Sequence, residues 1–282
     1  RRSSDLRIAF ADLGWETASL RNLSLLSLLV WALAMVGLFF VSLVLSSVAL
    51  RPAERAWQQQ RQFVADASHE LKTPLTVILA NTGLVLSHPE DTVAAQSKWL
   101  EYTHDEAEQM KGLVDDLLFL AKSDAARQPA ARAETAISEV ALGCLLPFES
   151  VAFESGVALE HRITLGLSLR GDEGQLRRLV MILLDNAVKY AGPGGTVTLT
   201  LERHQERLRL AVHNTGEPIP PEHLPHLFER FYRADAARNR SGGGYGLGLA
   251  IARSIVEGHH GRLTVTSTAA AGTTFTALFP RR

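Results

Sequence analysis

One uncharged stretch near the beginning of the chain differs from everything that follows it. Residues 22–50 contain no Asp, Glu, Lys or Arg and lie between Arg21 and Arg51. At a rise of about 1.5 Å per residue, such a helix is about 43 Å long, enough to cross a hydrocarbon core of about 30 Å. Its apolar residues follow no amphipathic period, and the stretch is too long for a cleaved signal peptide. We therefore predict a transmembrane helix over residues 22–50 rather than a buried core helix.

Two helical patterns follow, and together they predict an antiparallel hairpin. In the first, apolar residues recur at spacings of three and four from Phe63 to Ile78. A polar break at residues 87–91 separates it from a second stripe, which runs from Trp99 to Leu120 and is close to a heptad. Two helices cannot bury both stripes by themselves, so we expect a dimeric four-helix bundle.

The first stripe leaves one histidine, His69, facing solvent within the run SHELKTP (68–74). A neutral imidazole is a usable nucleophile at pH 7, and Glu70 beside it can accept a proton or orient the ring. Pro74 removes a helical hydrogen bond to the carbonyl of Glu70, so the helix can bend next to His69. An exposed histidine is more often inert, and a proline can be a plain kink. These residues alone leave both interpretations open.

From residue 137 onward, helical and strand patterns alternate. A charged, Ala-rich segment at 122–136 precedes them and suits a linker. Helical patterns cover residues 142–154 and 171–189, and strand patterns cover residues 157–169, 196–202, 208–213, 263–267 and 273–278. Such a mixture predicts an α/β sandwich, in which helices cover one face of a sheet.

Two segments of this region carry side chains suited to an anionic ligand. Asn186 and Lys189 lie about one turn apart on a helix, where an amide oxygen and an ammonium could hold magnesium and phosphate. In HNTGEPIP (213–220), Asn214 offers a donor and an acceptor, and Gly216 allows close approach of a planar ligand. Each signal is weak by itself, because exposed Asn and Lys are common.

A third segment, SGGGYGLGLAIA (241–252), is a glycine-rich loop that leads into an apolar helix. Its backbone N–H groups and the helix N-terminus favour phosphate oxygens, although most glycine-rich loops are simply flexible. The loop does not follow a strand within a short βαβ unit, so a dinucleotide-binding Rossmann site is disfavoured.

Composition excludes several other classes of protein. The 29 basic and 30 acidic side chains nearly balance, so we expect no direct nucleic-acid partner. The single cysteine, Cys144, excludes a disulfide framework within this chain and a multi-cysteine metal site. The length allows about two globular domains beside the apolar stretch.

The segment FVADASHELKTPL (63–75) resembles the phospho-accepting box of the sensor histidine kinases of two-component systems. This resemblance implies that His69 is phosphorylated on a ring nitrogen and that Glu70 assists as a base. It also implies that Thr73 positions a water that hydrolyses the phospho-aspartate of a response regulator.

The stretches LLDNAVKY (183–190), HNTGEPIP and SGGGYGLGLAIA resemble, in this order, the N, G1 and G2 boxes of an ATPase fold. Histidine kinases share that fold with Hsp90-type chaperones, MutL and type II topoisomerases. LFERFYRAD (227–235) resembles the F box, in which Phe228 and Phe231 anchor a lid, and GTTF (272–275) resembles the last box. The resemblance implies ATP and Mg²⁺ as cofactors, with Asn186 as the metal ligand. The implied nucleotide-binding residues are Asn186, Lys189, Tyr190, Asn214, Gly216, Gly244, Gly246, Leu247, Gly248 and Thr274.

Three positions depart from the family pattern. Asn214 replaces the usual Asp, Pro218 replaces a glycine, and Ile182 replaces a second asparagine. Asn214 can still accept a hydrogen bond from the adenine amine, so we expect ATP to bind. Ile182 cannot bond to phosphate or to metal-bound water, so we expect slower turnover. An ATP-binding receptor with degenerate kinase activity, acting mainly as a phosphatase, remains the alternative. A chaperone- or repair-type ATPase is disfavoured by the box around His69 and by the apolar helix.

The sequence thus predicts a membrane-bound sensor histidine kinase that forms a homodimer and transfers phosphate from ATP through His69 to an aspartate of a response regulator. The predicted segments are an extracytoplasmic end at 1–21, a transmembrane helix at 22–50, a signalling helix at 51–62, a dimerisation and phosphotransfer domain at 63–122, a linker at 123–136 and a catalytic ATP-binding domain at 137–282. Because ATP is cytoplasmic, residues 51–282 are expected on that side. About 18 residues separate the apolar stretch from His69, too few for a HAMP domain.

Overall fold

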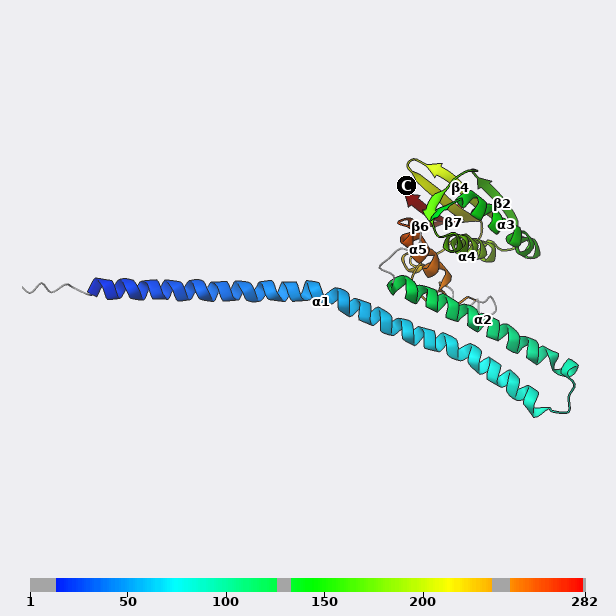
Figure 1. Ribbon diagram of the computed structural model, residues 1–282, viewed down its shortest axis with the longest axis horizontal. Helices are drawn as coiled ribbons and strands as arrows, with labels where there is room; N and C mark the ends of the chain where they lie inside the picture. The colour runs from blue at the N-terminus through cyan, green and yellow to red at the C-terminus, as the bar shows by residue number, and fades with distance from the viewer. Residues whose placement is uncertain (1–13, 126–132, 235–243, 281–282) are drawn as a thin grey trace, which may run out of the picture. The chain divides into compact units, whose positions relative to one another are not determined.

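The computed structural model describes residues 14–125, 133–234 and 244–280. The chain divides into two units, Arg1–Val64 and Ala65–Arg282, and helix α1 (Gly14–Ser87) contributes to both. The other elements are labelled in Figure 1, where there is room for a label. The helices are α2 (Val93–Ala125), α3 (Ile137–Glu154), α4 (Glu173–Ala191) and α5 (Gly248–Gly258), with a 3-10 turn at Leu224–His226. The strands are β1 (Ala133–Thr135), β2 (Ala158–Ile163), β3 (Leu169–Gly171), β4 (Thr196–His204), β5 (Arg207–Asn214), β6 (Arg262–Thr268) and β7 (Gly272–Pro280).

The apolar part of α1 is long enough to cross a bilayer. The candidate span is Ser19–Ser47, 29 residues with a mean hydropathy of 2.7, and none of its most apolar window is buried. The core helix of a soluble protein would be covered by other elements, whereas the described side chains here are exposed. The span begins and ends three residues before the predicted one. One apolar helix of this kind favours membrane association.

Helices α1 and α2 form the predicted hairpin. Helix α1 ends at Ser87 and α2 begins at Val93. Gln96 closes the turn, because its side-chain nitrogen donates to the carbonyl oxygens of Val85 at 3.3 Å and His88 at 2.7 Å. These carbonyls lie at the end of α1, where no further helical turn can supply a donor. The hairpin buries only part of the predicted stripes: Pro74, Leu113 and Leu120 are buried, whereas Leu75 and Trp99 are exposed.

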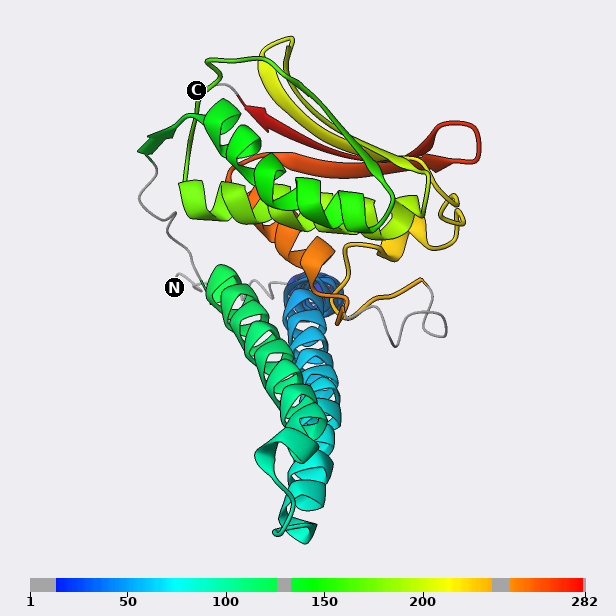
Figure 2. The same cartoon turned by 90° about the vertical axis from the view of Figure 1, so that its right-hand side faces the viewer.

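The C-terminal domain is a five-stranded sheet in the order β2-β4-β5-β7-β6. β2 pairs with β4 in parallel, and the other neighbours are antiparallel. Helices α3, α4 and α5 lie on the same face of this sheet (Figure 2). The prediction of an α/β sandwich with helices on one face is therefore confirmed.

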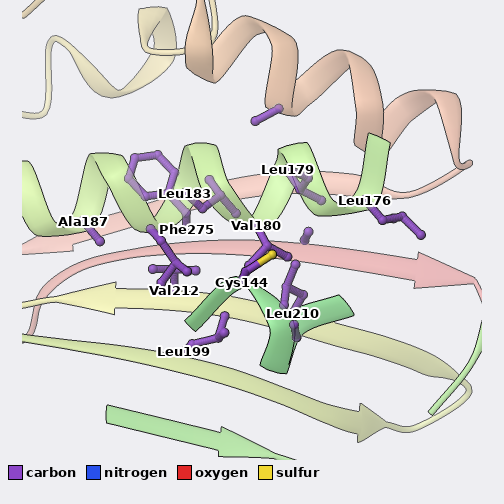
Figure 3. Packing of buried hydrophobic residues seen from close by; sticks show 14 of the residues in the cluster. Cys144, Leu176, Leu179, Val180, Leu183, Ala187, Leu199, Leu210, Val212 and Phe275 are labelled. Atoms are coloured by element: carbon purple, nitrogen blue, oxygen red, sulfur yellow. The ribbon is translucent and has the colours of Figure 1, made fainter. Parts of the chain in front are cut away.

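The core of this domain lies between the helices and that face of the sheet (Figure 3). Helix α4 turns a stripe with spacings of three and four toward the strands, and Asp172 caps its first turn by accepting from the N–H of Gln175 at 2.9 Å. The stripe consists of Leu176, Leu179, Val180, Leu183 and Ala187, and it faces Leu199, Leu210, Val212 and Phe275 of the sheet. Packing of α4 on the sheet holds both ends of the helix in place.

Three expectations about local elements were wrong at the start of this domain. Within the segment expected to be a linker, α2 continues to Ala125 and Ala133–Thr135 forms β1, which pairs with β3 more than thirty residues later. Helix α3 begins at Ile137 rather than at residue 142. The single strand expected over 157–169 is two strands. Ser138 explains the break, because its hydroxyl donates to Thr164 O at 2.8 Å and accepts from Leu167 N at 3.0 Å.

Within the unit Ala65–Arg282, charged contacts join α2 to the C-terminal domain. Arg178 of α4 pairs with Asp116 and lies 4.6 Å from the ring centroid of Phe119. Arg230 donates to both carboxylate oxygens of Asp124, at 2.7 and 2.8 Å. Burial raises the pKa of Asp116, although Arg178 opposes this shift. Ion pairs this exposed are typically worth about 0–1 kcal/mol, so these contacts hold the domain only weakly.

Candidate active site

The predicted phospho-acceptor His69 and its neighbours Glu70 and Thr73 lie on the second half of α1. His69 and Thr73 are exposed, and a spacing of four residues places them on the same face of the helix. Glu70 is half-buried, and Leu71 and Pro74 face the inside of the hairpin. The structure therefore presents His69 to solvent, as the hydrophobic spacing predicts, with a carboxylate as its immediate neighbour.

The last turns of α4 carry Asn186, Lys189 and Tyr190. Asn186 is half-buried, and Nζ of Lys189 lies 5.7 Å from the ring centroid of Tyr190. Partial burial lowers the pKa of Lys189, and the nearby charge of Arg233 acts in the same direction, whereas Asp185 opposes it. A bound anion would relieve both effects, so this end of α4 favours a phosphate.

Asn214 stands at the end of β5, between Val197 of β4 and Thr273 of β7. It is only 2% exposed, and its Nδ2 donates to Thr215 O at 2.8 Å. Among the hydrogen bonds of the described residues, none uses Oδ1 of Asn214. That orientation leaves an acceptor for an amine such as the exocyclic amino group of adenine.

Gly216 brings the next turn against the end of α4. Its φ is +134°, and a Cβ built there would lie 2.3 Å from the carbonyl oxygen of Tyr190. Only glycine fits such a close backbone approach without strain. The G1 and N segments, about 30 residues apart in sequence, are therefore adjacent in space.

The described part of the glycine-rich loop lies along the same helix. A Cβ on Gly244 would lie 3.6 Å from Nζ of Lys189, and one on Gly248 would lie 3.4 Å from Cγ2 of Ile182. Gly246 has φ +71°, and its carbonyl accepts from the N–H of Phe231 at 3.0 Å. The loop thus passes Lys189 and then starts α5. Gly242 and Gly243 lie outside the described residues.

Leu247 contributes to this loop in a different way from its glycines. Its side chain is 1% exposed and belongs to the hydrophobic core, and it directly precedes the first residue of α5. Any contact with a ligand therefore comes from its backbone. The buried side chain anchors the loop to the domain.

Among the predicted nucleotide-binding residues, Thr274 is one whose side chain lies on the opposite face of the sheet from Asn214. β7 alternates buried and half-buried residues, and Thr274 shares the outer face with His213, whose Nδ1 lies 3.1 Å from its hydroxyl. The neighbouring Thr273 faces inward beside Asn214 and is 3% exposed, with its hydroxyl 2.7 Å from that of Ser267. The period of two in a strand could have indicated Thr273 from sequence, once Phe275 was assigned to the core.

The two threonines make a matched pair of variants. We expect Thr273→Val to weaken ATP binding about fivefold, since loss of one buried hydroxyl costs about 1 kcal/mol. Thr274→Val should change ATP affinity by less than about twofold, because its hydroxyl lies on the opposite face. Titration of both variants with a fluorescent ATP analogue measures the difference, and equal affinities would contradict this assignment.

Tyr245 is a further residue that the sequence motifs did not single out. Partial burial raises the pKa of its hydroxyl, and the negative charges of Glu106 in α2 and Glu70 in α1 add to the shift. The charge of Glu70, next to His69, therefore acts on the tyrosine between Gly244 and Gly246.

The residues present fit a nucleotide with magnesium. The unused Oδ1 of Asn214, the close glycine backbone and the cation of Lys189 supply an acceptor for the base and groups for the phosphates. Among the described residues, no group of three His, Cys, Asp or Glu side chains could hold a metal by itself. Magnesium bound with a nucleotide commonly takes one or two protein ligands beside phosphate oxygens, which is compatible with Asn186.

Comparison with known families matches two consecutive models to this chain. Residues 59–126 match the His Kinase A (phospho-acceptor) domain, and residues 171–282 match the histidine kinase-, DNA gyrase B- and HSP90-like ATPase. The first model implies a dimer, and the second implies ATP binding.

Curated proteins and solved structures that are similar to this chain are also histidine kinases. The sensor histidine kinase RppB of Synechocystis is 36% identical over 250 residues, which cover 86% of this chain and 53% of that protein. The structure of the Acinetobacter baumannii histidine kinase AdeS has a TM-score of 0.63 at 20% identity, over 76% of this chain and 98% of that one. Full-length ShkA in complex with AMPPNP has a TM-score of 0.59 at 26% identity, over 78% of this chain and 45% of that one.

The present chain spans about half the length of the curated relatives it matches. The matched part contains the exposed His69 on its helical hairpin, followed by the ATPase fold with its glycine-rich loop. The chain therefore belongs to the sensor histidine kinases of bacterial two-component systems.

Proposed function

We propose that this chain is a membrane-bound protein-histidine kinase that phosphorylates His69 with ATP and passes the phosphoryl group to an aspartate of a response regulator. The observation that carries this proposal is the exposure of His69 in a phospho-acceptor domain. The same chain brings Gly216 and the glycine-rich loop against the end of α4, and we call this group of residues the nucleotide site. The autophosphorylation assay described in the Discussion tests it.

ATP is the nucleotide that we expect this site to bind. The related ShkA structure contains AMPPNP, which supports an adenine nucleotide here. Asn214 would accept from the adenine amine through Oδ1, and Lys189 would offset phosphate charge. Asn186 would hold magnesium together with phosphate oxygens, and the metal would further neutralise charge on the transferred group.

In the transfer step, a neutral ring nitrogen of His69 attacks the γ-phosphorus of ATP. The N–P bond forms as the bond from phosphorus to the bridging oxygen breaks, and ADP leaves with that electron pair. Glu70 accepts the proton that the imidazole loses. The ring must be neutral for this attack, because a protonated imidazole has no free lone pair.

The same domains support the proposed partners and location. The phospho-acceptor domain supports a homodimer, and the phosphohistidine requires an aspartate acceptor, which a response regulator supplies. The apolar helix supports a membrane anchor, and ATP would place residues 51–282 in the cytoplasm. Because α1 is a single helix from Gly14 to Ser87, a signal could pass along it from the membrane to the hairpin without a HAMP domain.

Phosphatase activity toward the response regulator is the second activity that we propose. Thr73 is exposed one helical turn from His69, where its hydroxyl can orient a water. We expect Thr73→Ala to lower dephosphorylation of the phosphorylated regulator at least about tenfold while autophosphorylation stays within about twofold. Both rates can be followed on one preparation with labelled phosphate. Equal loss of both activities would contradict the role of Thr73.

The degenerate receptor remains the alternative because of Ile182. Its Cγ2 would be 3.4 Å from a Cβ at Gly248, so an apolar methyl lies where the family pattern has an amide beside the loop. This residue cannot bind phosphate or metal-bound water. ATP binding without any labelled His69 would favour this alternative.

A further inference from the structure

The hydroxyl of Ser267 joins two segments next to Asn214. Ser267 lies in β6 opposite Thr273 of β7, and Thr273 pairs in turn with Asn214 of β5. The Ser267 oxygen accepts from the backbone N–H of Ile219 at 2.9 Å and lies 2.7 Å from the hydroxyl oxygen of Thr273. One side chain therefore contacts both the segment that follows Gly216 and the threonine beside Asn214.

The hydrogen bond from Ile219 fixes what the Ser267 hydroxyl can do. Ile219 follows Pro218, which has no backbone N–H, so Ile219 carries the first backbone donor after the proline. A backbone N–H can only donate, so the Ser267 oxygen is the acceptor in this bond. The single hydrogen of the Ser267 hydroxyl is left for another acceptor.

The direction of the bond between Ser267 and Thr273 decides what Thr273 can offer a ligand. Among the described residues, the Thr273 oxygen is the acceptor that lies within hydrogen-bond distance of the Ser267 hydroxyl. If Ser267 donates, the hydroxyl hydrogen of Thr273 has no acceptor in the described part of the chain, at a residue only 3% exposed. A buried donor is costly unless another group takes its hydrogen bond. The spare hydrogen then lies beside Asn214, whose Oδ1 none of the described residues uses.

A donor next to an acceptor matches one edge of adenine. The exocyclic amine of adenine donates, and the ring nitrogens on either side of it accept. The amine can therefore meet Oδ1 of Asn214 while a ring nitrogen takes the hydrogen of Thr273. Guanine has an oxygen in place of the amine, and this oxygen would face Oδ1 acceptor to acceptor. If Thr273 donated to Ser267 instead, the ring nitrogen would find no donor.

We propose that Ser267 is a positioning residue that directs the hydroxyl hydrogen of Thr273 toward a ring nitrogen of adenine. Ile219 donates to Ser267, Ser267 donates to Thr273, and Thr273 donates to the base. The half-buried Ser267 acts through Thr273 and does not touch the nucleotide itself. This inference rests on the proposed binding of ATP and deepens it by naming a residue that sets the direction of a hydrogen bond to the base.

Analogues of ATP test this role without reliance on phosphorylation. ATP, 1-deaza-ATP and 7-deaza-ATP are titrated into the full chain in detergent and their affinities are measured by calorimetry. Each analogue replaces one of the two ring nitrogens beside the amine by C–H and so removes one acceptor. The unaltered chain should bind one of the two analogues about fivefold more weakly than ATP, because that analogue loses the hydrogen bond from Thr273.

Two substitutions at position 267 should remove this preference. In Ser267→Ala, no group at position 267 keeps the Thr273 hydrogen from turning away from the base. In Ser267→Asp, the ionised carboxylate has only acceptors, so it keeps the bond from Ile219 but draws the Thr273 hydrogen toward itself. Both variants should bind ATP and the discriminated analogue with affinities within about twofold of each other. The ratio of two affinities is unaffected by a general loss of folded protein.

Two further variants serve as controls. Ser267→Thr keeps the hydroxyl and should keep the fivefold preference of about the same size. Thr266→Ala removes the neighbouring hydroxyl, which is exposed and lies on the outer face of the sheet opposite Thr274. It should also keep the preference, because successive residues of a strand face opposite sides.

Three results would overturn the inference alone. They are equal affinities of the unaltered chain for ATP and both analogues, a preference that persists in both Ser267→Ala and Ser267→Asp, and a preference that Thr266→Ala also loses. Absence of ATP binding by the unaltered chain would overturn the proposed function, and this inference with it. Thermal unfolding, measured in parallel, reports how much stability each substitution costs.

Discussion

Substitution of His69 by glutamine is expected to abolish phosphorylation of this chain by ATP. The side-chain amide of glutamine is not a nucleophile, so no phosphoramidate can form at position 69. His69 is exposed, and surface substitutions away from special features change stability by about 0.5 kcal/mol or less. The variant should therefore fold, dimerise and bind ATP like the unaltered chain. The measurement is incubation of the full chain in detergent with γ-labelled ATP and Mg²⁺.

The label itself identifies the modified residue. Phosphohistidine is labile in acid and stable in alkali, so label on His69 should survive alkali treatment and be lost in acid. His104→Gln is the matched control, because His104 is another exposed histidine of the same hairpin and should not affect labelling. Persistent label in His69→Gln would contradict the assignment. Bound ATP with no label in the unaltered chain would instead favour the degenerate receptor.

Replacement of Gly216 by alanine should have the second large effect, on ATP binding rather than on phosphotransfer alone. The added Cβ would lie 2.3 Å from the carbonyl oxygen of Tyr190, and the backbone at φ +134° is unfavourable for any L side chain. The turn after β5 must then move away from α4, which separates Asn214 from Lys189 and Tyr190. We expect ATP affinity to fall at least about 100-fold, equivalent to about 2.7 kcal/mol.

Gly166→Ala separates this steric effect from a general loss of stability. Gly166 also has a positive φ, of +71°, but a Cβ there would meet no atom within 4 Å. Its substitution should cost about 1 kcal/mol of folding stability with unchanged ATP affinity. Calorimetric titration with ATP and thermal unfolding measure both quantities on the two variants. ATP affinity within about threefold of the unaltered chain for Gly216→Ala would exclude close packing of the G1 turn on α4.

Local patterns were sufficient for most of the secondary structure and for the position of His69. The apolar stretch, the two helical stripes and the alternating strands all depend on periods of 3.6 or 2 within a few residues, so they can be recognised without knowledge of neighbours. The exposure of His69 follows from the same period. The linker prediction was wrong because β1 is defined by its pairing with β3, and no local pattern in three residues reports such a partner.

The amino-acid sequence by itself determined the family and the order of the domains, and it supplied the candidate residues of the site, because these depend on short motifs with recognisable chemistry. Only the tertiary structure decided which of two adjacent threonines faces inward beside Asn214, since a shift of one residue in a strand reverses the face. It alone brought Gly216 against Tyr190 and the glycine-rich loop against Lys189 and Ile182. It also showed that the amide of Asn81 is buried without an acceptor, whereas that of Gln96 is satisfied. Each of these depends on atoms distant along the chain meeting in space, a relation that local periodicity does not contain.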